Sequence, residues 1–203
     1  MSDKELIWSR LLADIGNEYG VAALMGNLQA ESGLISYRLQ GDFSSGYQTS
    51  IDYTNKVNSG EISKSDFVNN GPNGGGYGLA QWTYPPRKQA LYEKWQSGGY
   101  HSIGSVTLAC DYLLYELKND YVGVYNVLKS ASSIRVASDK VLHDFENPAD
   151  QSVSVEILRA QYGASIYEEM KGVPPSGGGG GSTSTKKKKG YNFILFNRRR
   201  RIV

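Results

Sequence analysis

Apolar residues recur at helical spacing along most of residues 1–172, with polar residues between them. The first stretch, residues 4–19, places Ile7, Leu11 and Ile15 on one face and predicts a helix. We expect further helices at residues 50–57, 63–68, 85–95, 105–118, 122–128 and 133–144. No segment alternates apolar and polar residues as paired strands do. The pattern therefore predicts a mainly α-helical protein.

A second helix is predicted to end at Gly33, which reads as a left-handed stop residue. Leu24 and Leu28 belong to its apolar face, and Glu31 continues that face. Burial disfavours the charged form of a carboxyl group and raises its pKa, so Glu31 is a candidate general acid. A solvated glutamate at a helix end has the same pattern, and this alternative stays open.

The last helix is predicted over residues 147–170. Asn147 is a suitable N-cap residue, and Pro148 suits the first helical turn. Gly172 is a stop signal, with Pro174 beyond it. We therefore expect the helix to begin directly after residue 146.

Two segments interrupt the apolar pattern. Residues 36–70 are rich in polar residues and glycine, which suits a small polar lobe on a rigid scaffold. Residues 71–78 form a glycine-rich loop. Because this loop lacks a Gly-Lys-Ser/Thr motif and no apolar strand precedes it, a nucleotide site is disfavoured.

The charge distribution divides the chain into three parts. Residues 1–172 form the predicted folded domain, residues 173–185 a Pro/Gly/Ser/Thr linker, and residues 186–203 a basic, aromatic, disordered tail. Before Lys186 there are 14 basic and 20 acidic residues, a net charge of −6, whereas the tail carries +8. The tail is either a solvated segment or a docking segment for an acidic protein or an anionic surface. Clustered Arg and Lys with aromatic residues can also bind nucleic acid, but nothing else in the sequence supports that function.

Several classes of site have no sequence support. No apolar run approaches the ~20 residues of a membrane span, and the start of the chain lacks a signal-peptide pattern. Cys110 lies in an apolar helical stripe, which indicates a core thiol rather than a nucleophile. His101 and His143 are isolated, so we expect neither a metal nor a cofactor.

Three segments in this order resemble the phage tail-associated lysozymes, a lysozyme-fold family related to lytic transglycosylases and goose-type lysozymes. They are Gly-Asn-Leu-Gln-Ala-Glu-Ser at 26–32, Gly-Tyr-Gly-Leu-Ala-Gln-Trp-Thr at 76–83, and Phe-Glu-Asn-Pro-Ala-Asp at 145–150 with Arg159 and Tyr162. The resemblance covers about residues 7–170. It departs from the family at Asn147, where an arginine is common, and the basic tail lies outside it.

The resemblance implies a lysozyme-like helical domain that cleaves peptidoglycan between N-acetylmuramic acid and N-acetylglucosamine. The implied location is a phage virion or tail acting at the bacterial cell wall, where the basic tail is a candidate contact for phage tail proteins. Glu31 would be the general acid, and Ser32 would hold the turn or the carboxylate. The other implied substrate-binding residues are Tyr77, Gln81, Trp82 and Tyr162.

The resemblance supplies one carboxylate, whereas most glycosidases use two. Asp42, Asp52 and Asp66 in the polar lobe are candidates, and Asp42 is preferred because it follows Glu31 closely, beside Gly41. A plain surface aspartate is the alternative. Without a second carboxylate, the N-acetyl group or 6-hydroxyl of the substrate itself can act.

Three classes of function remain after this reasoning. The first is a glycan-strand hydrolase or lytic transglycosylase. The second is a non-catalytic wall-binding or structural tail module on a lysozyme scaffold. The third is an amidase or endopeptidase that uses Cys110 with His143, although an apolar helical stripe is a poor setting for a thiolate.

Overall fold

The computed structural model describes residues 1–175, which are mainly α-helical as predicted. Pairing of strands within these residues is limited to isolated bridges, Leu39 with Tyr77 and Tyr77 with Trp82. The basic tail and most of the linker lie outside the described residues. The helices are α1 (Asp3–Ile15), α2 (Glu18–Ser32), α3 (Gln48–Ser59), α4 (Lys64–Asn69), α5 (Pro85–Ser97), α6 (Val106–Asn119), α7 (Val122–Lys129), α8 (Ile134–Val141) and α9 (Val153–Met170).

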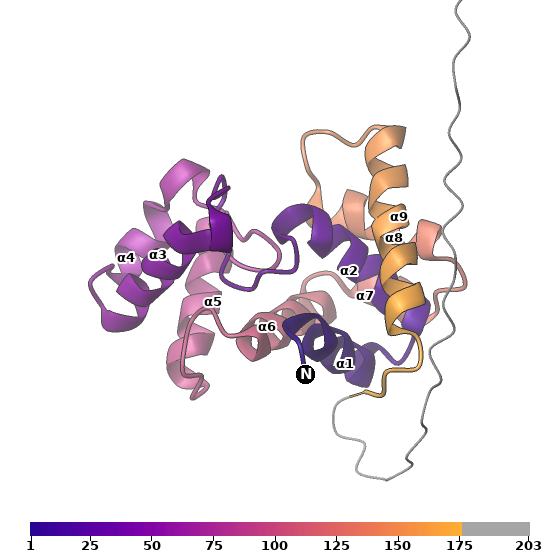
Figure 1. The fold of residues 1–203 in the computed structure, drawn as a ribbon, viewed down its shortest axis with the longest axis horizontal. Helices are drawn as coiled ribbons and strands as arrows, with labels where there is room; N and C mark the ends of the chain where they lie inside the picture. Colours follow the sequence, from indigo (N-terminus) through magenta and orange to yellow (C-terminus); the bar gives the residue numbers. More distant parts are fainter. Residues whose placement is uncertain (176–203) are drawn as a thin grey trace, which may run out of the picture.

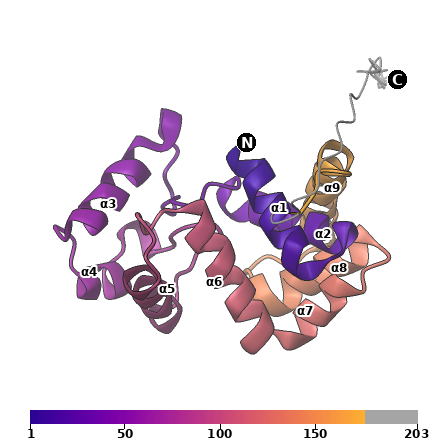
Figure 2. The same ribbon diagram turned by 90° about the horizontal axis from the view of Figure 1, so that it is seen from below.

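The helices form two parts. Helices α1, α2, α7, α8 and α9 form the larger part, and α3 and α4 lie beside α5 at the other end (Figure 1). Helix α6 runs between the two parts in the view from below (Figure 2). The smaller part contains the predicted polar lobe, since α3 and α4 fall within residues 36–70.

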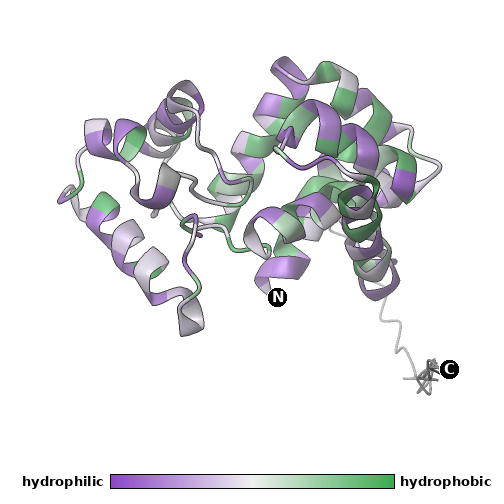
Figure 3. Ribbon diagram, turned by 90° about the horizontal axis from the view of Figure 1, so that it is seen from above, coloured by the Kyte–Doolittle hydropathy of each residue, from purple (hydrophilic) through white to green (hydrophobic). Residues whose placement is uncertain are grey.

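Helix α2 is the centre of the larger part, where it contacts α1, α7, α8 and α9. Its residues from Gly20 to Leu28 are all buried, because neighbouring helices cover it on several sides. Figure 3 shows hydrophobic residues concentrated on helix faces that turn toward other helices. The last turn of α2, which carries Glu31, is less covered by neighbouring helices.

A close crossing of α2 and α9 requires glycine on both helices. A Cβ atom on Gly26 would lie 2.5 Å from the Arg159 carbonyl oxygen and 2.5 Å from the Gly163 nitrogen. A Cβ atom on Gly163 would lie 2.9 Å from the Ala22 carbonyl oxygen. The two glycines therefore let α9 approach the backbone of α2, next to the end that carries Glu31.

The predicted end of α2 is confirmed, since Gly33 has a φ of 67° and caps the helix. The predicted first helix, residues 4–19, is divided into two. Gly16 is left-handed with a φ of 71°, and the side chain of Asn17 caps α2 by accepting a hydrogen bond from the Gly20 amide. The glycine and the cap residue thus outweigh the continuous apolar pattern.

The predicted start of the last helix, at Asn147 and Pro148, is wrong. Helix α8 continues as a π-helical turn, Leu142–Glu146, which ends at Asn147 with a φ of 44°. Asparagine tolerates this left-handed conformation better than most residues. Helix α9 begins only at Val153, after Ser152. Residues 147–152 therefore form a loop between the two helices.

None of the helices in residues 1–175 combines the length and the apolar character needed to cross a membrane. The remaining predicted helices are present, with ends that differ by a few residues. In the lobe, Phe67 packs edge-on against Tyr77 with 5.3 Å between ring centroids. This contact joins α4 to the glycine-rich loop and so fixes the wall of the cleft described next.

Candidate active site

A cleft of about 500 Å³ lies between the two parts of the structure. Its lining comes from the end of α2, the following loop, the glycine-rich loop, the start of α5 and the segment after α8. The residues are Ala30, Glu31, Arg38, Gln40, Gly41, Phe43, Ala80, Gln81, Thr83, Tyr84, Arg87, Glu146 and Pro148.

Glu31 lies in this cleft, with 20% of its side chain exposed. Its Oε1 accepts a hydrogen bond from Arg159 Nη2 at 2.5 Å, and the two form an ion pair. The Arg159 side chain is only 8% exposed. The sequence pattern predicted an apolar surrounding for Glu31, whereas α9 supplies a buried cation.

A buried contact chain holds Arg159 in place. Arg159 Nη1 donates to Asn27 Oδ1 at 3.3 Å, and Asn27 Nδ2 donates to the hydroxyl of Ser138 at 3.0 Å. Asn27 thus joins α2 to α8 and orients the arginine that contacts Glu31. This explains Asn27 in the Gly-Asn-Leu-Gln-Ala-Glu-Ser segment, since a buried amide needs such partners.

Ser32 is fully buried and holds the turn rather than facing the cleft. Its hydroxyl donates to the Leu79 carbonyl oxygen at 2.7 Å, which ties α2 to the glycine-rich loop. Gln81 does line the cleft, in a left-handed conformation with a φ of 46°. Its amide donates to the carbonyl oxygens of Arg38 and Gly78.

Tyr77 and Trp82 do not face the cleft, contrary to the expectation. Both are buried, with exposed fractions of 1% and 0%. The Tyr77 hydroxyl is 2.8 Å from that of Thr54, and Trp82 Nε1 donates to Glu116 at 2.8 Å. Their polar atoms are therefore engaged within the core, and a saccharide in the cleft cannot contact these rings.

Tyr162 is also absent from the cleft lining, although it lies on α9 as predicted. It is exposed, and Arg159, one turn earlier on α9, is the residue that reaches Glu31. Residues three apart on a helix share a face, but only the arginine is directed at the end of α2.

Asp42 is a structural residue here. It is 5% exposed, and both carboxylate oxygens accept hydrogen bonds, from Ser44 and from Ser50. Burial alone would raise its pKa, but these hydrogen bonds hold the pKa well below the usual range. Asp52 and Asp66 do not line the cleft, and each accepts a hydrogen bond within or beside its own helix.

Glu146 is the other acidic residue that lines the cleft within residues 1–175, and the sequence reasoning assigned it no role. Its Oε1 is enclosed and accepts no hydrogen bond from the described residues. Burial, and then the negative charge of Glu31, raise its pKa to about 8. Glu146 follows an apolar helical stripe, the same signal that singled out Glu31.

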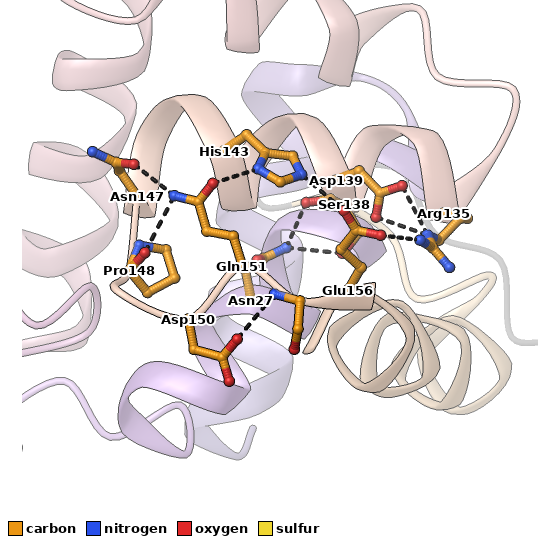
Figure 4. Close-up of polar contacts among 11 residues, drawn as sticks. Asn27, Arg135, Ser138, Asp139, His143, Asn147, Pro148, Asp150, Gln151 and Glu156 are labelled. Atoms are coloured by element: carbon orange, nitrogen blue, oxygen red, sulfur yellow. Dashed lines mark hydrogen bonds and ion pairs between the residues drawn. The ribbon is translucent and has the colours of Figure 1, made fainter. Parts of the chain in front are cut away.

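The loop after Glu146 is held by a polar network between α8 and α9 (Figure 4). The His143 ring contacts Gln151 at 2.8 Å and Glu156 at 2.9 Å, and Gln151 also donates to the Pro148 carbonyl oxygen. Arg135 joins the network through Glu156. The network fixes the position of Pro148 on the wall of the cleft.

The alternative Cys/His site is not assembled. Cys110 is fully buried in α6, and burial raises the pKa of its thiol to about 12. Both ring nitrogens of His143 face Gln151 and Glu156 instead. Across the described part of the chain, no group of three or more His, Cys, Asp or Glu residues is placed to hold a metal ion.

Comparison with known protein families identifies the family of this chain. A model of the phage tail lysozyme family matches residues 2–170, nearly all of the described chain. Searches of curated proteins and of solved structures found no match. The match covers the cleft and each of the three segments that suggested the resemblance. The chain therefore belongs to the phage tail lysozyme family, which supports a lysozyme-like, cell-wall-lytic role.

Proposed function

We propose that this protein cleaves the glycan strands of peptidoglycan between N-acetylmuramic acid and N-acetylglucosamine, as a component of a phage tail. Glu31 is the general acid in this proposal. The observation that carries it is the position of Glu31 at the end of α2, partly exposed in a cleft of about 500 Å³. Such a cleft is large enough for a few sugar units and presents a carboxyl group to them.

Two exposed aromatic side chains support a saccharide ligand. Phe43 and Tyr84 both line the cleft, with exposed fractions of 87% and 65%. Aromatic rings offer flat apolar surface to the faces of sugar rings. We assign to them the substrate-binding role that the family resemblance implied for Tyr77 and Trp82, while Gln81 remains a candidate polar contact.

The reaction follows from one proton transfer. A carboxyl proton passes to the glycosidic oxygen, the bond from C1 to that oxygen breaks, and the electron pair stays on the oxygen. Water or the 6-hydroxyl of the muramic acid then attacks C1 and returns a proton to the site. Attack by water is hydrolysis, and attack by the 6-hydroxyl gives an anhydromuramic end.

The test is digestion of purified peptidoglycan with the wild-type protein and with Glu31→Gln, followed by mass spectrometry of the products. We expect a defined muramic acid end from the wild type and no product from the variant. Glu93→Gln is the matched control, because Glu93 is exposed on α5 and outside the cleft. Thermal melts of all three proteins confirm folding.

Two results would contradict the proposal. The first is full activity of Glu31→Gln. The second is a wild-type protein that binds the wall and forms no product, which would instead support a non-catalytic wall-binding module on this scaffold.

A further inference from the structure

We propose that Glu146 is the second functional carboxyl group of the cleft and acts through Glu31. In this proposal the two carboxyl groups hold one proton between them near neutral pH, and Glu146 keeps that proton available to Glu31. The inference rests on the proposed function, because it concerns how the general acid obtains its proton. Glu146 is therefore a positioning residue for the proton.

The need for such a residue comes from the surroundings of Glu31. A general acid must donate a proton, whereas Glu31 Oε1 is occupied by the ion pair with Arg159, with 2.5 Å between Oε1 and Nη2. Asn27 holds Arg159, and the Arg159 side chain is nearly buried. The arginine is therefore not readily displaced. A second carboxyl group in the cleft can therefore serve as the source of the proton that Glu31 passes on.

Glu146 has the opposite surroundings. Its Oε1 is enclosed and without a hydrogen-bond partner among the described residues, and an ionised carboxylate in this situation is costly. The charged groups that act on it electrostatically are Glu31 on α2, Arg87 on α5, Glu116 on α6 and Arg159 on α9. Each arginine is already paired with another carboxylate.

These pairs explain why neither cation ionises Glu146. Arg87 donates to both oxygens of Glu116, at 2.6 and 2.9 Å, and Arg159 pairs with Glu31. Two arginines thus balance two carboxylates, and the third carboxyl group is neutral when it carries a proton. Two acids of unequal surroundings then titrate as a pair.

The proton balance closes over one reaction. The proton of Glu146 passes to the Glu31 carboxylate and from there to the glycosidic oxygen as the bond to C1 breaks. The attacking hydroxyl group loses its proton to the pair, which returns to the state with one proton. No other reactant is required.

The experiment is the pH profile of peptidoglycan cleavage for wild type, Glu146→Gln, Glu146→Asp and the control Glu93→Gln. Glu146→Gln removes the carboxyl group that holds the proton, so the alkaline limb should move to lower pH. Glu146→Asp should restore part of the shift, and Glu93→Gln should match the wild type. An unchanged limb, or an equal loss of activity at every pH, would overturn the proposal.

A second measurement does not depend on activity. Carboxyl-carbon NMR should show Glu146 titrating near pH 8 in the wild type and at lower pH in Glu31→Gln, because the like charge is gone. Titration of Glu146 in the ordinary range of glutamate, or no change in Glu31→Gln, would overturn the inference. A wild type without cleavage products would contradict the proposed function, while this titration would still decide the proton pair.

Discussion

The crossing of α2 and α9 makes a quantitative prediction for Gly26→Ala. The new Cβ would lie 2.5 Å from the Arg159 carbonyl oxygen, 2.5 Å from the Gly163 nitrogen and 2.8 Å from the Gly163 Cα. All three atoms belong to the backbone of α9, so no side-chain rotation relieves the overlap. Helix α9 must move away from α2.

The magnitude follows from two opposing terms. Overpacking costs about 1–3 kcal/mol, and we expect the upper end because only backbone can yield. Replacing a glycine inside a helix gains about 0.5–1 kcal/mol. The net loss is then about 2 kcal/mol, which lowers Tm by about 4–8 °C for a chain of this size.

The assay is a thermal melt with Gly123→Ala as the control. Gly123 lies in α7, and a Cβ there meets no atom within 4 Å. The control should therefore raise Tm slightly, whereas Gly26→Ala lowers it and moves Arg159 away from Glu31. A Tm of Gly26→Ala equal to that of the control would refute the reasoning.

Four further outcomes are expected. Asp42→Asn should lower the free energy of unfolding by about 1.5–3 kcal/mol at neutral pH and leave cleavage intact. Because the pKa of Asp42 is depressed in the folded state, this stabilisation is present above its ordinary pKa of 3.8 and is lost as the pH falls below that value. Thermal melts at several pH values can check it. Trp82→Phe should lower Tm without changing KM, whereas Phe43→Ala should raise KM without changing Tm, as steady-state kinetics and melts would show. The contacts of His143 with Gln151 and Glu156 raise the pKa of His143. The stabilisation from these contacts is therefore present below pH 6.5 and is lost as the pH rises through the raised pKa. Hydrogen exchange of residues 147–152 should become faster over the same rise in pH. Removal of residues 176–203 should leave cleavage of isolated wall unchanged, since the cleft is lined by residues between 30 and 148; a large loss would contradict this.

The sequence alone determined the local features of this protein. Helical periodicity located the helices, and Gly33 marked the end of α2 because glycine adopts a left-handed conformation at low cost. The position of Glu31 on the apolar face followed from the same periodicity. These are properties of short segments, and the residues that produce them are neighbours in sequence.

Tertiary structure decided which of the candidate side chains reach the cleft. The motif that contains Tyr77 and Trp82 is recognisable in sequence, but α4 and α6 cover both rings, whereas Phe43 is left exposed. Asp42 is occupied because its loop brings Ser44 and Ser50 to it. Sequence composition cannot indicate these contacts, since burial of a loop residue depends on what packs against it.

The presence of Glu31 and Glu146 in one cleft was also a tertiary outcome. The two residues lie at the ends of different helical segments, and only the packing of α2, α8 and α9 brings them into one cleft. The close packing of α2 and α9 depends on Gly26 and Gly163, and the sequence alone does not indicate which backbone atoms these glycines approach. The raised pKa of Glu146 then follows from neighbours that are distant in sequence, because electrostatic interactions act through space rather than along the chain.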